Sequence, residues 1–324
     1  MVYGKRTNGL MKHLRDVHGI SIEGSKNKKD LLNMGYYHGY KGYRFIKKSN
    51  DRIPYTDFDE IVAIYQFDVQ LKTLFYPHIM FIETALKNHT LDTLIGYGQA
   101  DFDYIYRQLL NDYKKHDVGS SKYRKAVKRK LDLRNAVNNS IAYHYNNKRD
   151  VIEHFFHTNK PIPLWAIFEI INFGDFGFFV MCLNEEVRKT IAQDLNVHST
   201  NYNQNGRIVE DMIFLIKELR NSVAHNSVIF DCRFQKTSPP ARLKGYIENE
   251  TNISGITFEN IIDYLVVTIF LLKNLGVSKA EIRKVIKQFS MESEKLRNAI
   301  PVNAHTSIMG SDMKTKLGKL RVFV

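Results

Sequence analysis

Hydrophobic residues recur at helical spacing along almost the whole chain. Apolar side chains three or four positions apart line one face of a helix, whereas strict alternation of apolar and polar residues marks a strand. A short strand is expected only near residues 228–234. Helical spacing covers residues 7–18, 58–95, 101–113, 121–147, 163–183, 185–195, 207–225, 258–275 and 278–289. The sequence therefore predicts an all-α protein.

Individual residues indicate where these helices begin, bend or stop. Pro77 lies within 58–95 and cannot donate to the helical ladder, so this stretch is either two helices or one kinked helix. Gly174 and Gly177 predict an interruption within 163–183. Ser278, followed three residues later by Glu281, predicts a capping box at the start of the last helix.

Changes in composition divide the chain into three parts. Residues 1–56 form a basic, tyrosine-rich N-terminal segment, and residues 57–292 form the helical core with a basic insertion at 113–149. Residues 293–324 are expected to form a polar, loosely packed tail. Within the core, residues 226–251 are the longest stretch without helical periodicity.

Length and composition are those of a folded intracellular protein. The 324 residues, 44% of them hydrophobic, suffice for a large buried core. No stretch reaches the roughly 18 uninterrupted apolar residues of a membrane span, and the first residues are polar and basic, unlike a secretory signal. Cys182 and Cys232 are too few for a disulfide framework, which favours a reducing cytoplasm. We expect neither a metal nor a cofactor, since no ligand spacing or nucleotide fingerprint is present.

The net charge of +13 indicates a polyanionic partner. Residues 113–134 carry nine Lys or Arg against two Asp. Such a stretch is either a solvated helical face or a surface that binds RNA backbone. In the second interpretation the RNA-binding residues are Lys122, Arg124, Lys125, Lys128, Arg129 and Lys130.

The helix predicted at 207–225 ends with a group of polar residues suited to phosphate chemistry. At 100° per residue its apolar residues gather on one side, and Asn221 and His225 fall together on the other. Arg220 lies at the edge of that polar face. His225 can transfer a proton near neutral pH, Arg220 can hold a phosphate, and Asn221 can orient either. The alternative is that both basic side chains only interact with the helix C-terminus.

The spacing from Arg220 to His225, with Asn221 directly after the arginine, resembles the signature of the HEPN superfamily. Further segments resemble the Abi-like (AbiD/AbiF-type) abortive-infection proteins, whose core is a HEPN bundle. They are the Gly- and Tyr-rich residues 31–43, the helix at 58–88, the Pro-Leu-Trp…Glu…Phe-Gly pattern of 163–174, and 220–226. The chain departs from the family at Lys87, where an arginine is common; a lysine would hold a phosphate less rigidly.

The resemblance implies an all-α, HEPN-type helical bundle with additional N-terminal helices. It also implies a metal-independent endoribonuclease of abortive infection or of a toxin–antitoxin pair, which cleaves RNA through its 2′-OH and is silent until phage attack. Some relatives bind a small regulatory RNA. In this interpretation Arg220, Asn221 and His225 are catalytic and Asn226 supports them. Glu83 could position Arg220 or His225, although Glu83 and Lys87 are as readily an ordinary helical ion pair.

The tyrosine-rich segment and the single Arg–His pair suggest further partners. The tyrosines of this segment are interleaved with cations and could stack RNA bases, with Tyr40 and Lys41 as the candidate residues. Alternatively, these tyrosines could pack in the core. Because one helix offers only one Arg and one His, we expect a homodimer with a composite site.

Two rival hypotheses are a non-catalytic RNA-binding or scaffold protein and a bundle that accepts a nucleotide modification on a tyrosine. No membrane partner is expected.

Overall fold

The computed structural model describes residues 4–324 and confirms the all-α prediction. Within these residues the only β-type pairings are isolated bridges, such as that between Phe45 and Arg52. The strand expected at 228–234 is absent there, because the backbone of this stretch turns repeatedly, with a left-handed φ of 57° at Cys232. No helix of the described part is long and apolar enough to cross a membrane.

The chain folds into two compact units, each assembled from separate segments. Unit 1 comprises residues 1–79, 218–238 and 247–324, and unit 2 comprises residues 80–217 and 239–246. Three helices pass from one unit into the other. They are α3 (Phe58–Ile95), α10 (Arg207–Ala224) and α11 (Ala241–Thr251).

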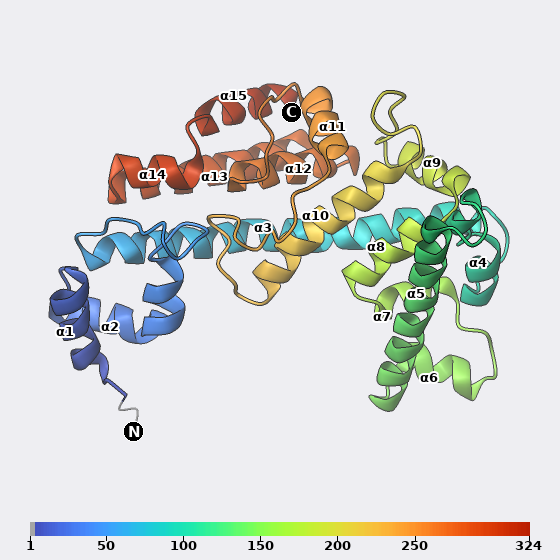
Figure 1. Cartoon of the computed structure of the whole chain (residues 1–324), viewed down its shortest axis with the longest axis horizontal. Helices are drawn as coiled ribbons and strands as arrows, with labels where there is room; N and C mark the ends of the chain where they lie inside the picture. Colours follow the sequence, from blue (N-terminus) through green and yellow to red (C-terminus); the bar gives the residue numbers. More distant parts are fainter. Residues whose placement is uncertain (1–3) are drawn as a thin grey trace. The chain divides into compact units, whose positions relative to one another are not determined.

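Unit 1 contains the first and the last helices of the described residues. Its N-terminal part contains α1 (Thr7–His18), α2 (Gly24–Met34) and the π-helix η1 (Gly35–Lys41). Its C-terminal part contains α12 (Ile261–Asn274), α13 (Lys279–Ala299), α14 (Val302–Met309) and α15 (Met313–Phe323). Twelve residues of α12 are buried, and α12, α13 and α15 pack against one another (Figure 1). The predicted capping box of Ser278 and Glu281 is confirmed at the start of α13.

Unit 2 is organised around the long basic helix α5. It contains α4 (Phe102–Gln108), the 3-10 turn η2 (Asp112–Lys115), α5 (Ser121–Asn146), α6 (Asp150–His157), α7 (Leu164–Ile170), α8 (Phe173–Cys182) and α9 (Glu185–Asp194). Helix α5 packs against α6, α7, α8 and η2 (Figure 1). The break within 163–183 falls at residues 171–172, where Asn172 caps α8, and not at the glycines. Gly174 and Gly177 lie inside α8, where a Cβ on Gly177 would come within 3.0 Å of Phe214.

Helix α3 is continuous from Phe58 to Ile95, with Pro77 inside it. Proline at 77 leaves the carbonyl oxygen of Thr73 without its helical donor. Both Thr73 and Pro77 are exposed, so water can hydrogen-bond to that carbonyl. The stretch 58–95 is therefore one helix and not two.

A buried carboxylate fixes the start of α10 within unit 2. Asp112 accepts from Arg188 at 2.8 Å, from Arg207 at 3.0 Å and from Lys115 at 2.8 Å. Burial opposes ionisation, but Lys115, Arg188 and Arg207 together lower the pKa of Asp112. Because Arg207 is the first residue of α10, this cluster ties the helix start to η2 and α9.

Both cysteines are free, in line with the expectation of no disulfide framework, and both are buried. Burial raises the pKa of the Cys182 thiol to about 12. Burial also raises the pKa of Cys232 well above its ordinary value. Thiols that resist ionisation in this way are poor nucleophiles at neutral pH.

The expectation of a loose C-terminal tail is wrong. Residues 293–299 complete α13, and the following residues form α14 and α15. Helix α15 buries one face despite the polar composition of this segment: Leu320 is fully buried, whereas Val322 is 87% exposed. Lys316 is buried as well and forms ion pairs with Asp263 at 2.6 Å and Asp312 at 2.9 Å.

We therefore predict that α15 contributes to the stability of unit 1. Leu320→Ala should lower the free energy of unfolding by about 2–5 kcal/mol, because it removes a fully buried side chain. Val322→Ala, on the same helix, should leave it nearly unchanged. Urea unfolding of both variants measures the difference, and equal midpoints would contradict the packing of α15.

Candidate functional site

The end of α10 is closed by a hydrogen-bonded cap that fixes the position of His225. The helix ends at Ala224, and Asn226 has a left-handed φ of 53°. The amide of Asn226 donates to the carbonyl of Val223 at 3.2 Å, and the amide of Ser227 donates to that of Ser222 at 2.8 Å. This pair of bonds is a Schellman motif, in which asparagine takes the left-handed position usually given to glycine. His225 is the residue between helix and cap.

Asp68 of α3 anchors the segment that follows the cap. Its carboxylate, fully buried, accepts from the amides of Ile229 at 2.8 Å and Phe230 at 2.7 Å. It also accepts from the hydroxyl of Tyr43 at 2.8 Å. Hydrogen bonds to a charged acceptor each contribute about 1.5–3 kcal/mol. One carboxylate thus joins α3, the tyrosine-rich segment and the chain after α10.

Lys72 extends this connection to the helix cap itself. Its ammonium forms an ion pair of 2.8 Å with Asp68 and donates to the side-chain oxygen of Asn226 at 2.8 Å. The Lys72 side chain is only 10% exposed, so these two partners replace most of its contacts with water. Asn226, predicted as a supporting residue, therefore acts through the backbone cap and through Lys72.

A second carboxylate joins the tyrosine-rich segment to the same loop. Asp231 accepts from Arg233 at 2.7 Å and from the amide of Lys47 at 2.6 Å. Arg233 also donates to the carbonyls of Gly42 and Phe45, each at 2.8 Å. With Nε and both terminal nitrogens engaged, Arg233 holds the loop 225–234 against residues 42–45.

The tyrosine-rich segment adopts an uncommon conformation. Residues 35–41 form a π-helix, a form often found at functional sites. Gly39 makes it possible, because a Cβ there would lie 2.7–2.9 Å from the side chain and carbonyl of Met34. Gly39 thus allows a close approach between the π-helix backbone and the Met34 side chain. The π-helix exposes Tyr37 and His38.

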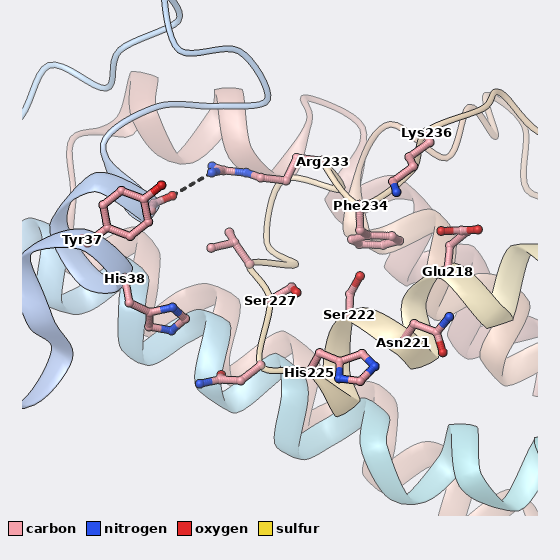
Figure 2. A pocket seen from close by; sticks show the side chains of 13 residues that line it. Tyr37, His38, Glu218, Asn221, Ser222, His225, Ser227, Arg233, Phe234 and Lys236 are labelled. Carbon is pink, nitrogen blue, oxygen red and sulfur yellow. Dashed lines mark hydrogen bonds between the residues drawn. The ribbon is translucent and has the colours of Figure 1, made fainter. Parts of the chain in front are cut away.

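These elements enclose a pocket of about 760 Å³ within unit 1. Its volume is in the range of small-molecule and nucleotide sites. In Figure 2, His38 and His225 lie along one side and Arg233 and Lys236 along the other. The lining also includes Tyr37, Gly42, Glu218, Asn221, Ser222, Asn226, Ser227, Val228 and Phe234.

The structure brings two of the three predicted catalytic residues together. Asn221 and His225, which helical spacing places on one side of α10, both line the pocket. Arg220 is not among the lining residues of the described chain; it is half-buried, and its Nη1 donates a long hydrogen bond of 3.4 Å to the Asn221 side chain. Arg220 therefore borders the pocket through Asn221.

Glu83 and Lys87 belong to unit 2. They form an ion pair of 3.2 Å, four residues apart, and Lys87 also donates to the carbonyl of Ile171 at 3.1 Å. Lys87 is thus joined to the segment between α7 and α8. A supporting role of Glu83 for Arg220 or His225 stays a prediction.

The predicted RNA-binding cations of α5 fall into two groups. Lys122, Arg124 and Lys125 are exposed at its N-terminal end. Lys128 pairs with Asp132 at 2.6 Å, and Lys130 lies over the rings of Tyr106 and Tyr113, at 4.5 and 5.1 Å from their centroids. Burial lowers the pKa of Lys130. Arg129 is half-buried, so the first group is the most accessible part of the surface.

The tyrosines of the N-terminal segment divide between core and surface. Tyr40, expected to contact RNA, is 3% exposed and packs against His18 and Tyr36, with ring centroids 5.3 Å away in each case. The prediction for Tyr40 is corrected, since no face of its ring is available to a base. Lys41 lies 5.6 Å from the Tyr36 ring centroid. Tyr37, 82% exposed, is the member of the segment that can stack.

Sequence reasoning missed His38, Arg233 and Lys236 as pocket residues. The motif around His38 is defined by its glycines and tyrosines, and no spacing within it marks the histidine. Arg233 and Lys236 fall in the stretch without helical periodicity, which has no regular geometry from which to place a side chain. The one sequence feature that could have indicated Arg233 and Lys236 is that both are cations lying shortly after the Arg220–Asn226 motif.

Comparison with known families gives one match. The model of a family described as Abi-like protein matches residues 29–231, more than half of the chain. The matched region includes η1, Asp68, α5 and the end of α10, and it stops at Asp231. Searches of curated proteins and of solved structures found no significant match.

We predict that Asp68 is the main determinant of the pocket's rigidity. Asp68→Ala should lower the free energy of unfolding by about 3–5 kcal/mol, because it leaves Lys72 buried without its carboxylate. Hydrogen exchange at the amides of Ile229 and Phe230 should accelerate as well. The control is Asp59→Asn, an exposed carboxylate on the same helix, which should behave as wild type. Unchanged exchange at both amides would contradict the anchoring role.

Proposed function

The chain belongs to the Abi-like protein family, and from this premise we propose that it is a metal-independent endoribonuclease toxin. Membership indicates a part in abortive infection, a bacterial defence against phage. The observation that carries the finer proposal is the pocket at the end of α10. It offers an exposed imidazole and an amide, His225 and Asn221, on a backbone held by the buried Asp68.

The proposed reaction uses the RNA's own 2′-OH as nucleophile. A bond forms between O2′ and phosphorus while the bond from phosphorus to O5′ breaks, giving a 2′,3′-cyclic phosphate and a 5′-hydroxyl. The 2′-OH must lose a proton and the leaving oxygen must gain one. Imidazole is suited to either transfer because it changes protonation state near neutral pH. His225 fills this role in the proposal.

Negative charge that develops on the phosphate oxygens also requires stabilisation. Asn221 lines the pocket and can donate to a phosphate oxygen. Arg220, in contact with Asn221, and Lys236, exposed on the pocket, supply positive charge. We expect these three side chains to bind the reacting phosphodiester.

The basic surface of α5 supports RNA as the partner. The exposed Lys122, Arg124 and Lys125 follow one another within a single helical turn. Cations so arranged gain affinity for a nucleic acid backbone through release of counterions. In the proposal, the RNA bound there is the substrate or a small regulatory RNA. A homodimer remains a further prediction, tested by the mass of the protein in solution.

We predict that His225→Ala lowers the rate of RNA cleavage by about 10²–10⁴-fold, the usual contribution of a general acid or base. The measurement is cleavage of a single-stranded RNA under single-turnover conditions, with product ends identified by mass. His198→Ala is the matched control, because it removes an exposed histidine from unit 2 and should leave the rate unchanged. Cleavage should continue in the presence of a chelator.

Each result bears on a different part of the proposal. Full activity of His225→Ala would exclude His225 as the proton-transfer group. Loss of wild-type activity in chelator would exclude a metal-independent mechanism. RNA that is bound by the wild type but never cleaved would favour the non-catalytic RNA-binding alternative.

We also predict that replacing Lys122, Arg124 and Lys125 with Gln weakens RNA binding in a salt-dependent manner. Losing three phosphate contacts should reduce the slope of log affinity against log salt by about 2, taking 0.7 for each contact to a single strand. Binding to a single-stranded RNA at several salt concentrations measures this slope. A control triple replacement of Lys279, Arg283 and Lys284, exposed on α13, removes the same charge. Equal losses in both variants would show that net charge alone acts.

A further inference from the structure

The pocket holds a second histidine that lies outside the Arg220–His225 motif. His38 comes from η1, nearly 190 positions before His225, yet both line the same pocket (Figure 2). Both residues are exposed, and within residues 4–324 neither imidazole takes part in a hydrogen bond or ion pair. Both rings are therefore available to a ligand.

The other ionisable groups of the pocket do not offer the same chemistry. They are Tyr37, Glu218, Arg233 and Lys236. Arg233 is held by Asp231 and by two carbonyls, and a guanidinium keeps its charge at all working pH values. Unlike the side chains of Tyr, Glu, Arg and Lys, imidazole ordinarily changes protonation state between pH 5 and 8. His38 is thus the natural complement of His225.

We propose that His38 and His225 form the acid–base pair of the cleavage reaction. One imidazole accepts the proton of the 2′-OH as O2′ bonds to phosphorus. The other, protonated, donates its proton to O5′ as the bond from phosphorus to O5′ breaks. The two imidazoles exchange protonation states, and no other reactant is consumed. This inference rests on the proposed ribonuclease function and adds a second catalytic residue to it.

The same contacts that fix His225 also fix His38. Tyr43, two residues after η1, donates to Asp68, the carboxylate that holds the amides of Ile229 and Phe230. The carbonyl of Gly42 accepts from Arg233, which is itself bound to Asp231. The segments that carry the two histidines therefore share their anchors. A positioned acid and base require this kind of rigidity.

Both imidazoles come from one chain. The expectation of a composite site in a homodimer arose because one helix supplies only one histidine. With His38 present, a single subunit contains both proton-transfer groups. A dimer is then not needed to complete the acid–base pair.

The test compares wild type, His38→Ala and His225→Ala on two RNA substrates. The first is an ordinary single-stranded RNA, on which each variant should lose about 10²–10⁴-fold in single-turnover rate. The second carries sulfur in place of O5′ at one linkage, a leaving group that needs no proton. On it, the variant lacking the acid should recover to near the wild-type rate, while the variant lacking the base stays slow.

Two controls separate loss of catalysis from loss of structure. Urea unfolding of His38→Ala should match wild type, because His38 is exposed. Binding to an RNA with a 2′-deoxy sugar at the cleavage site should also be unchanged within about threefold. His198→Ala serves again as the histidine control in unit 2.

The outcomes distinguish this inference from the function it rests on. If the wild type cleaves no RNA, the proposed function and the pair fall together. If the wild type cleaves and His38→Ala cleaves as fast, the ribonuclease stands and the pair is wrong. If both variants are slow and the sulfur substrate restores neither, the two histidines do not divide acid and base between them.

Discussion

One buried carboxylate, that of Asp68, determines the geometry of the candidate site. It receives two backbone amides, a tyrosine hydroxyl and a lysine ammonium from separate parts of the sequence. Burying a charged group is very costly unless the group is hydrogen-bonded and paired with an opposite charge, and Asp68 meets both conditions. Its partners cannot shift independently, because each would leave part of the carboxylate unsatisfied. The loop after α10 is therefore rigid although it has no regular secondary structure.

Helix α10 is held at both ends by such carboxylates. Asp112 binds Arg207 at its first residue, and Asp68 with Lys72 holds the cap after its last. The apolar face of the helix supplies burial between these points, with Ile213, Ile216 and Leu219 fully buried. Within unit 1, His225 thus lies at a helix end whose backbone cap is held by Lys72 and Asp68. A pocket residue placed in this way needs little reorganisation when a phosphate binds.

Periodicity predicted the elements well where a helix has one apolar face. It located α10, with Asn221 and His225 on its polar side, and it identified the cap of α13 from Ser278 and Glu281. Hydrophobic periodicity did not predict α14 and α15, where polar residues outnumber the buried apolar ones. It also could not describe a loop that is held in place by side-chain hydrogen bonds. A strand was expected at 228–234, but the amides of Ile229 and Phe230 bond to Asp68 instead of to a neighbouring strand. His38 escaped notice because its position depends on a π-helix and a close glycine contact, which no spacing rule describes.

The pocket between η1 and the end of α10 is where we expect the reacting phosphodiester to bind. The most direct measurement is a crystal structure with a short RNA that carries a 2′-deoxy sugar at the cleavage position. We expect a phosphate within hydrogen-bond distance of both His38 and His225, with Asn221 contacting one of its oxygens. A phosphate bound only along α5, with this pocket empty at saturating RNA, would contradict it.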